Sequence, residues 1–192
     1  MPGSSLWLLP PPAASQNPLF PLIEKTSARF GSPHRFLPHI TLTSELLPST
    51  YGSDPQGWLD SLELPAGEDI RVRYEKLDSE NVFFRKLYIK CAKTSGVEEL
   101  AMRCRQKVEG FGDAQTAQTW VAESYKPHLS LLYHDCPVVD AQGLLEVEQY
   151  AEEFGIDVHG KATINGWEGG RVVLVPTDQP ISEWNPIAER RL

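Results

Sequence analysis

The chain has 192 residues, of which 41% are hydrophobic and 23% are charged, and its formal net charge is −8. This composition is that of an ordinary globular protein, long enough for one sizeable core. The acidic balance argues against a protein that wraps a nucleic-acid duplex, because backbone binding needs many Lys and Arg contacts. It still allows a small phosphate ester to bind in a locally positive pocket.

Apolar periodicity and turn signals predict a mixture of helices and strands. Asn17 followed by Pro18 predicts the start of the first helix, and Gly31 predicts its end. In chain order we expect a strand at 5–9, a helix at 17–30, a strand at 35–44, a short helix at 54–62, strands at 70–77 and 82–91, a helix at 96–111, a strand at 128–134, a helix at 141–154, and two strands within 161–176.

The spacing of these elements favours antiparallel sheets. The two strands within 70–91, and the two within 161–176, are too close in the chain for helical crossovers. No Gly/Ser linker or block of charge divides the sequence. We therefore predict a single α+β domain over residues 1–192.

One short pattern occurs twice. The sequence Pro-His-Ile-Thr-Leu at 38–42 reappears as Pro-His-Leu-Ser-Leu at 127–131. Side chains alternate along a strand, so His39 and Thr41 are predicted to share one face, as are His128 and Ser130. Each copy follows a predicted helix, which indicates an ancient duplication with two similar lobes about an approximate two-fold axis. The two histidines would then line one cleft from opposite sides.

Paired histidines beside hydroxyls suit phosphodiester hydrolysis. Opening a cyclic phosphate needs a base to activate water and an acid to protonate the departing sugar oxygen, and histidine titrates close to neutral pH. Hydroxyls of Thr41 and Ser130 can hydrogen-bond the phosphoryl oxygens in the transition state. A single His-x-Thr in a strand is usually structural, but two aligned copies favour the catalytic interpretation. This scheme needs no metal and no cofactor.

These motifs resemble the signature of the 2H phosphoesterase superfamily, and more narrowly the fungal and plant cyclic phosphodiesterases, the 2',3'-cyclic-nucleotide 3'-phosphodiesterases. The similarity covers most of the chain, and its most specific segment is Tyr-Lys-Pro-His-Leu-Ser-Leu-Leu-Tyr at 125–133; others are 6–10, 36–41 and 82–85. It implies a bilobal α+β fold, with two antiparallel-sheet lobes and flanking helices around a central cleft. It also implies hydrolysis of nucleoside 2',3'-cyclic phosphates to 2'-phosphates and of ADP-ribose 1'',2''-cyclic phosphate, in the metabolism of tRNA-splicing by-products.

Carried over residue by residue, the resemblance implies that His39 and His128 are the catalytic acid and base. Either histidine fits either role. Phosphate binding is implied for Thr41, Ser130 and Tyr133, although Tyr133 reaches the same face as Ser130 only at a bulge or a strand end.

The resemblance also points to aromatic contacts with the base or ribose. Phe84 matches a family aromatic at a hairpin tip, where a ring can stack on a nucleobase, and Trp7 follows the family pattern at the edge of the cleft. For both residues a plain core role is the alternative. The nearby cations Arg85, Lys86 and Lys126 would make the cleft positive, but the simpler interpretation places them in solvent.

The predictions of cellular context and partners rest on features that the sequence lacks. The three cysteines, Cys91, Cys104 and Cys136, form no CxxC pair, which predicts buried thiols in a reducing compartment and no metal site. The apolar start lacks a basic region and is interrupted by prolines, so neither a signal peptide nor membrane insertion is predicted. We expect an intracellular, cytoplasmic monomer that binds small cyclic phosphate nucleotides without a stable nucleic-acid partner; association with an organelle surface is the alternative that the sequence leaves open.

Two alternatives remain open. One is a 2',5'-phosphodiesterase or RNA-end processing enzyme of the same superfamily, for which a longer basic groove is expected. The other is a nucleotide-binding module without catalytic activity, against which both complete motifs speak.

Overall fold

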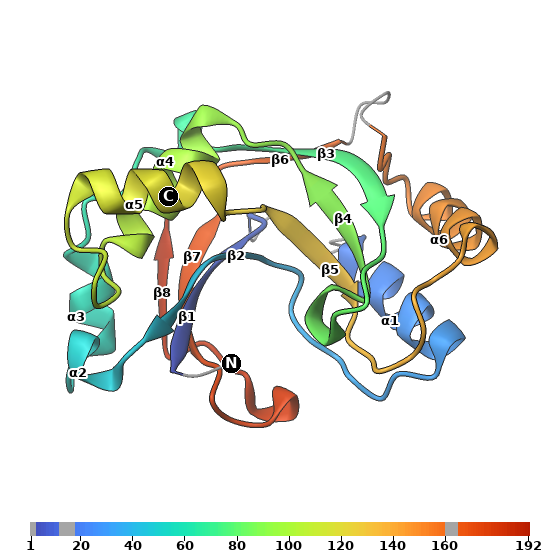
Figure 1. Cartoon of the computed structure of the whole chain (residues 1–192), viewed down its shortest axis with the longest axis horizontal. Coiled ribbons are helices and arrows are strands. Elements are labelled where there is room, and N and C mark those ends of the chain that lie inside the picture. Colours follow the sequence, from blue (N-terminus) through green and yellow to red (C-terminus); the bar gives the residue numbers. More distant parts are fainter. Residues whose placement is uncertain (1–2, 12–17, 160–164) are drawn as a thin grey trace.

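The computed structural model describes residues 3–11, 18–159 and 165–192 (Figure 1). Within these ranges the strands are β1 (Ser4–Leu9), β2 (Ile40–Leu46), β3 (Arg71–Asp78), β4 (Leu87–Cys91), β5 (His128–Leu132), β6 (Gly166–Glu168), β7 (Arg171–Pro176) and β8 (Ala188–Arg191). The α-helices are α1 (Leu19–Phe30), α2 (Pro48–Tyr51), α3 (Pro55–Asp60), α4 (Ser95–Arg105), α5 (Ala114–Glu123) and α6 (Ala141–Glu153). Short 3-10 turns are η1 (Gly67–Asp69), η2 (Phe83–Arg85) and η3 (Ile181–Glu183).

The strands form one strongly curled sheet in the order β6-β3-β4-β5-β2-β1-β7-β8, and the neighbouring strands run antiparallel. Strands β5 and β2 meet in the middle, where the residue pair Ile40↔Leu129 joins them. The α+β class predicted from the sequence is confirmed. The sheet is continuous across its middle, however, whereas the sequence suggested two separate sheets.

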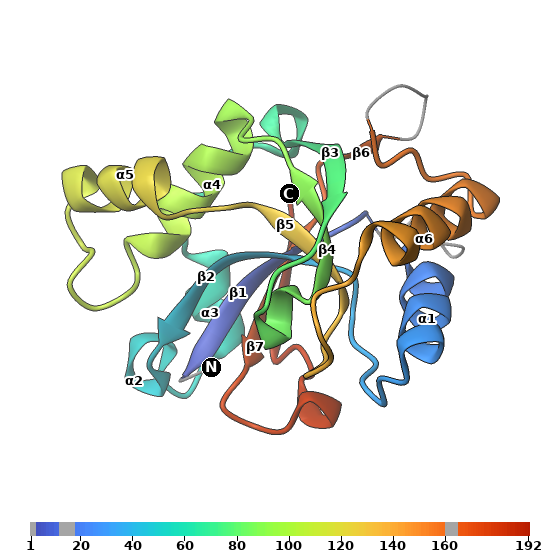
Figure 2. The ribbon, with the colours of Figure 1, turned by 45° about the vertical axis from the view of Figure 1, so that its right-hand side comes forward.

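Helices cover the sheet in two groups, one at each end of the molecule (Figures 1 and 2). Helix α1 packs on β5 and on α6, and α6 packs on β3, whereas α4 packs on β2 and on α5, and α3 packs on β8. Thus α1 follows β1 in the chain but covers β5, and α4 follows β4 but covers β2. Because each of these helices packs on the half of the sheet opposite to the strand it follows, the two connections link the two halves.

Strand β1 is buried on both of its faces, which explains its uninterrupted apolar run. Leu6 and Leu8 pack into the main core between the sheet and the helices. The alternate residues Trp7 and Leu9 point the other way, into a second buried cluster. We call this second group the inner cluster; it comprises Trp7, Leu9, Tyr133, Val173, Val175 and Trp184.

Several predicted elements match the structure closely, and others need correction. The first helix ends at Gly31, whose φ of 73° is the left-handed conformation that favours glycine; its proposed cap, Asn17, lies outside the described residues. The strand expected at 35–44 begins only at Ile40, and the helix expected at 96–111 ends at Arg105.

The hairpin region also differs from its prediction. Residues 83–85 of the expected strand 82–91 form the 3-10 turn η2, so that β4 begins at Leu87. Lys86, predicted to face solvent, is 2% exposed, and its Nζ donates to Asn81 Oδ1 at 3.2 Å. An ammonium group buried in this way needs such a partner.

Of the region 161–176, where two strands were expected, residues 161–164 lie outside the described ranges. The described part contains β6 and β7, which do not pair with each other. Strand β6 pairs with β3, and β7 lies between β1 and β8. Gly170, between them, has a φ of 129°, and a Cβ there would approach Leu9 O to 2.4 Å. Only glycine fits this close approach of two backbones.

The thiols of Cys91 and Cys104 are buried, as predicted, and burial raises the pKa of Cys104 to about 12; Cys136 is half-buried. None of the helices described here has the length and apolar character needed to cross a bilayer.

Candidate active site

The two motif histidines are held by the same local hydrogen bond. His39 immediately precedes β2, and its Nδ1 lies 2.6 Å from the carbonyl oxygen of Leu37. His128 is the first residue of β5, and its Nδ1 lies 2.7 Å from the carbonyl oxygen of Lys126. A carbonyl can only accept, so Nδ1 is the protonated nitrogen in each ring. Each neutral imidazole therefore keeps its lone pair on Nε2.

The strand register brings the two motifs together. Ile40 and Leu129 are paired neighbours, and both side chains are fully buried in the main core. In an antiparallel pair, the residues on either side of this contact point to the opposite face. That face holds a cavity of about 220 Å³, and the residues that line it are His39, Thr41, Val82, Phe84, Arg85, His128, Ser130 and Tyr133.

His39 is the more buried of the two histidines, at 5% exposure. Its ring stacks on Trp7, with ring centroids 3.8 Å apart and 11° between the ring planes. The hydroxyl of Tyr133 lies 3.5 Å from its Nε2. Burial lowers the pKa of His39 to about 4; the charge of His128 lowers it further, and the Leu37 carbonyl opposes the shift. His39 is therefore neutral in the free protein at pH 7.

His128 is half-buried and lies against the edge of Tyr88, with ring centroids 5.3 Å apart. Burial lowers its pKa, and the charge of Arg85 acts in the same direction, while the Lys126 carbonyl and Glu80 act against it. The carboxylate of Glu80 accepts from Tyr88 Oη at 2.7 Å and pairs with Arg85 Nη2 at 2.7 Å. The Glu80 carboxylate therefore holds both Tyr88 and Arg85, the two side chains beside His128, in position.

The hydroxyl groups predicted to bind phosphate lie in the same cavity. Thr41 is half-buried there, and Ser130 donates from Oγ to the Phe84 carbonyl at 2.8 Å. Tyr133 reaches the cavity because β5 ends at Leu132, which supplies the strand end that its position requires. Burial raises the pKa of Tyr133, so its hydroxyl stays protonated and able to donate.

The two predicted aromatic contacts are placed differently. Phe84 lies in η2 and lines the cavity, with its ring 5.8 Å from Trp184 and 5.2 Å from Tyr133. Trp7 is fully buried and does not line the cavity, so it cannot touch a base or ribose there. The suggested ligand contact of Trp7 is corrected accordingly: its indole lies beneath His39 as part of the inner cluster.

Some residues of the site were assigned to solvent or missed altogether by the sequence analysis. Arg85, predicted to face solvent, lines the cavity, and its Nε is buried without a hydrogen-bond partner among the described residues. Trp184 supports Phe84 from the C-terminal segment. Nothing in the local sequence marks Trp184, because its place depends on how β7 and β8 fold back onto the sheet.

Within the described ranges, no group of three or more His, Cys, Asp or Glu residues is arranged to hold a metal ion.

Known proteins resemble this chain along its whole length. The model of the cyclic phosphodiesterase-like protein family matches residues 1–192. A protein of Phaeosphaeria nodorum named 2',3'-cyclic-nucleotide 3'-phosphodiesterase is 60% identical over 193 residues, covering all of both chains. A Neurospora crassa protein of the same name is 38% identical over 216 residues, again covering all of both chains. A Saccharomyces cerevisiae protein of the same name is 25% identical over 174 residues, covering 78% of this chain and 72% of its own length. The resemblance to cyclic phosphodiesterases predicted from the sequence is confirmed, and the chain belongs to the cyclic phosphodiesterase-like protein family.

Proposed function

We propose that this protein hydrolyses nucleoside 2',3'-cyclic phosphates, with His39 and His128 as its acid–base pair. The observation that carries the proposal is the shared cavity, which both imidazoles line while backbone carbonyls hold their Nδ1 atoms. The names of the relatives from P. nodorum and N. crassa support the same substrate class.

The reaction requires one proton to be removed and one to be supplied. A neutral imidazole takes a proton from water, whose oxygen forms a new bond to phosphorus. The bond from phosphorus to the ribose 3'-oxygen then breaks, and a protonated imidazole gives that oxygen its proton, which leaves a 2'-phosphate. Neither step needs a metal or another cofactor.

We assign the base to His128 and the acid to His39. His128 is the more exposed ring, so water from solvent reaches it first, and the charge of Arg85 favours its neutral form. Burial keeps His39 neutral in the free protein. The anionic cyclic phosphate must therefore raise the pKa of His39, as an opposite charge at short range does.

The remaining polar groups of the cavity bind the phosphoryl oxygens in this proposal. Thr41 and Tyr133 offer hydroxyl protons, and Arg85 offers positive charge close to the anion. Ser130 gives its proton to the Phe84 carbonyl in the free protein, so it must exchange that bond to donate to the phosphate. Phe84 offers a ring on which the base can stack.

Further parts of the proposal come from the family resemblance. They are hydrolysis of ADP-ribose 1'',2''-cyclic phosphate, the place in tRNA-splicing by-product metabolism, and two lobes related by an approximate two-fold axis around the site. The single residue pair that joins β2 and β5 is compatible with two such lobes. The single domain, the monomeric state, the lack of a stable nucleic-acid partner and the intracellular location stay predictions from the sequence.

The test is incubation with adenosine 2',3'-cyclic phosphate in excess EDTA, followed by phosphorus NMR. We expect complete conversion to adenosine 2'-phosphate. A product with the 3'-phosphate would contradict the assigned bond cleavage, and activity that EDTA abolishes would contradict acid–base chemistry without a metal. Turnover confined to 2',5'-linked oligonucleotides would favour the alternative enzyme, and tight binding without product would favour a silent binding module.

A further inference from the structure

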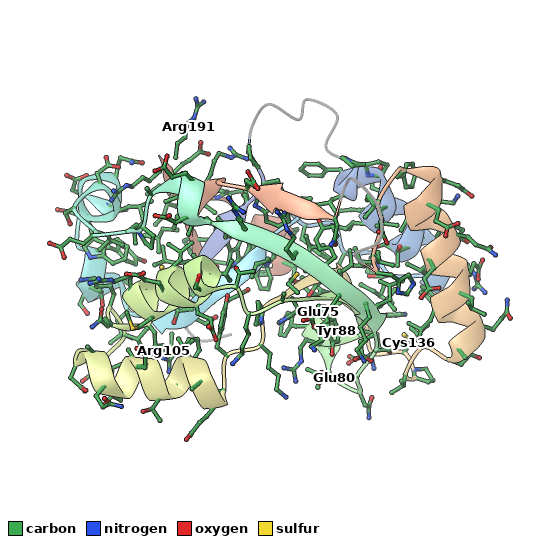
Figure 3. All side chains as sticks on the ribbon, turned by 90° about the horizontal axis from the view of Figure 1, so that it is seen from above. Glu75, Glu80, Tyr88, Arg105, Cys136 and Arg191 are labelled. Atoms are coloured by element: carbon green, nitrogen blue, oxygen red, sulfur yellow. The ribbon has the colours of Figure 1, made fainter. Side chains whose placement is uncertain are left out.

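A second cavity adjoins the catalytic one. It has a volume of about 340 Å³ and shares two lining residues, Arg85 and His128, with the cavity that holds both histidines. Its other walls come from the β3–β4 hairpin and from the residues before β5: Glu75, Glu80, Tyr88, Lys90, Cys91, Lys93, Lys126 and Pro127. In Figure 3 the labelled Glu75, Glu80 and Tyr88 lie together beside this hairpin.

The charges around this second cavity do not balance. Four cationic side chains line it against two carboxylates. Arg85 pairs with Glu80 at 2.7 Å, and Lys90 pairs with Glu75 at 2.6 Å. The charges within each of these two pairs cancel. The ammonium groups of Lys93 and Lys126 therefore supply the excess positive charge.

Lys93 and Lys126 have no carboxylate partner among the described residues. Lys93 Nζ instead donates to the carbonyls of Val121 and Ala122, at 2.6 and 3.0 Å, at the C-terminal end of α5. These bonds fix its ammonium group at the end of α5, and the residue lines the cavity. Lys126 is exposed, and its own carbonyl holds His128, so its position in the chain is tied to the catalytic ring.

Two cations without a carboxylate partner in the described ranges therefore line a cavity of a protein whose net charge is −8. Local positive charge in an acidic protein concentrates anions at that place. Lysine binds phosphate as a compact point charge. The chemistry of this wall therefore suits a phosphate group.

We propose that this second cavity binds an additional phosphate of the substrate, attached to the same nucleoside as the cyclic phosphate, through Lys93 and Lys126. The inference rests on the proposed function, because the two cavities share Arg85 and His128 and the cyclic phosphate is assigned to the first of them. A substrate with a second phosphate then reaches both cavities, whereas a simple nucleoside cyclic phosphate reaches only the first.

The experiment compares adenosine 2',3'-cyclic phosphate with its 5'-phosphorylated derivative. We expect kcat/KM to be about five- to tenfold higher for the derivative, since hydrogen bonds to charged groups are strong but part of this wall is exposed. The preference should shrink as salt is raised to 0.5 M, about the range in which exposed charges are screened. Lys126→Met should bring the ratio of the two kcat/KM values close to one.

Lys107→Met is the matched control, because Lys107 is an exposed lysine that lines neither cavity. It removes the same charge and should keep the wild-type ratio. Equal kcat/KM values for the two substrates in the wild-type protein, or a ratio unchanged by Lys126→Met, would overturn the second phosphate site while leaving the proposed function standing.

If neither substrate is hydrolysed, the proposed function is wrong, and isothermal titration still tests the cavity. The derivative should then bind more tightly than adenosine 2',3'-cyclic phosphate, and Lys126→Met should remove the difference. Equal Kd values would overturn the inference.

Discussion

The indole of Trp7 lies flat beneath the imidazole of His39, with 3.8 Å between ring centroids and 11° between ring planes. The same ring is also held by the Leu37 carbonyl, which accepts from Nδ1. A fully buried tryptophan and a backbone carbonyl thus determine together where Nε2 of His39 points. Trp7 is in this account a positioning residue for His39.

Replacement of Trp7 by phenylalanine should disturb this support without removing it. The smaller ring lets water approach the imidazole, so we expect the pKa of His39, followed by NMR, to rise above about 4. We expect the loss of packing to cost about 1–3 kcal/mol of stability and kcat to fall. Trp58→Phe, on α3, is the control. An unchanged His39 titration in Trp7→Phe would contradict the positioning role.

The lowered pKa of His39 also predicts how stability depends on pH. The unfolded chain takes up this proton below its ordinary pKa of 6.5, but the folded protein takes it up only near pH 4. The unfolded state thus binds more protons between these values, and the free energy of unfolding should fall as the pH drops from 6.5 to 4, by roughly 3 kcal/mol for this group. Below pH 4 its contribution should stay constant.

Urea unfolding at several pH values measures this dependence. Carboxylates titrate in part of the same range, so the comparison is between the wild type and His39→Gln. In the variant, the free energy of unfolding should depend less steeply on pH between 4 and 6.5, because the contribution of His39 is gone. Identical slopes would show that His39 titrates alike in both states.

Arg85 should act on the substrate and on His128. Arg85→Gln removes positive charge from the cavity wall, and we expect kcat/KM to fall about ten- to a hundredfold. The charge of Arg85 also lowers the pKa of His128, so this pKa should rise in the variant. Arg103→Gln, which breaks an exposed pair with Glu99, is the control. A purely structural role for Arg85 would leave the pKa of His128 where it is.

Phe84 should contribute to binding more than to chemistry. Base–aromatic stacking is worth about 1–3 kcal/mol, so Phe84→Leu should raise KM for adenosine 2',3'-cyclic phosphate about five- to a hundredfold and change kcat little. The effect should be smaller for a pyrimidine substrate, whose ring offers less area. Phe20→Leu, on the exposed side of α1, should keep the wild-type KM. An unchanged KM in Phe84→Leu would exclude stacking on this ring.

Local patterns predicted the parts of the fold that depend on local physics. Alternation and helical periodicity placed β1, β3, α1 and α6 within a few residues of their observed bounds. Helix α5 and strand β8 were not predicted from the sequence. Helix α5 (Ala114–Glu123) buries only Ala117 and Val121, and β8 reads Ala-Glu-Arg-Arg, a polar edge strand stabilised by its pairing with β7.

The residues of the site also fall into two groups, those that the sequence predicted and those that only tertiary packing places there. His39, Thr41, His128 and Ser130 could be named from the sequence because a repeated motif marks them, and Tyr133 was named from the family resemblance. The structure places all five along one cavity. The aromatic support from Trp7 and Trp184 and the inward turn of Arg85 arise from tertiary packing. Sequence spacing carries no signal for such contacts.

The catalytic use of both imidazoles is the central claim. The most direct measurement is the rate of hydrolysis of adenosine 2',3'-cyclic phosphate by His39→Gln and His128→Gln, with folding verified by circular dichroism. Each variant should lose about 10²- to 10⁴-fold in kcat, the usual contribution of a general acid or base, while His159→Gln, which changes an exposed histidine paired with Glu148, should keep wild-type activity. A folded His39→Gln or His128→Gln protein that hydrolyses the substrate at the wild-type rate would contradict the account.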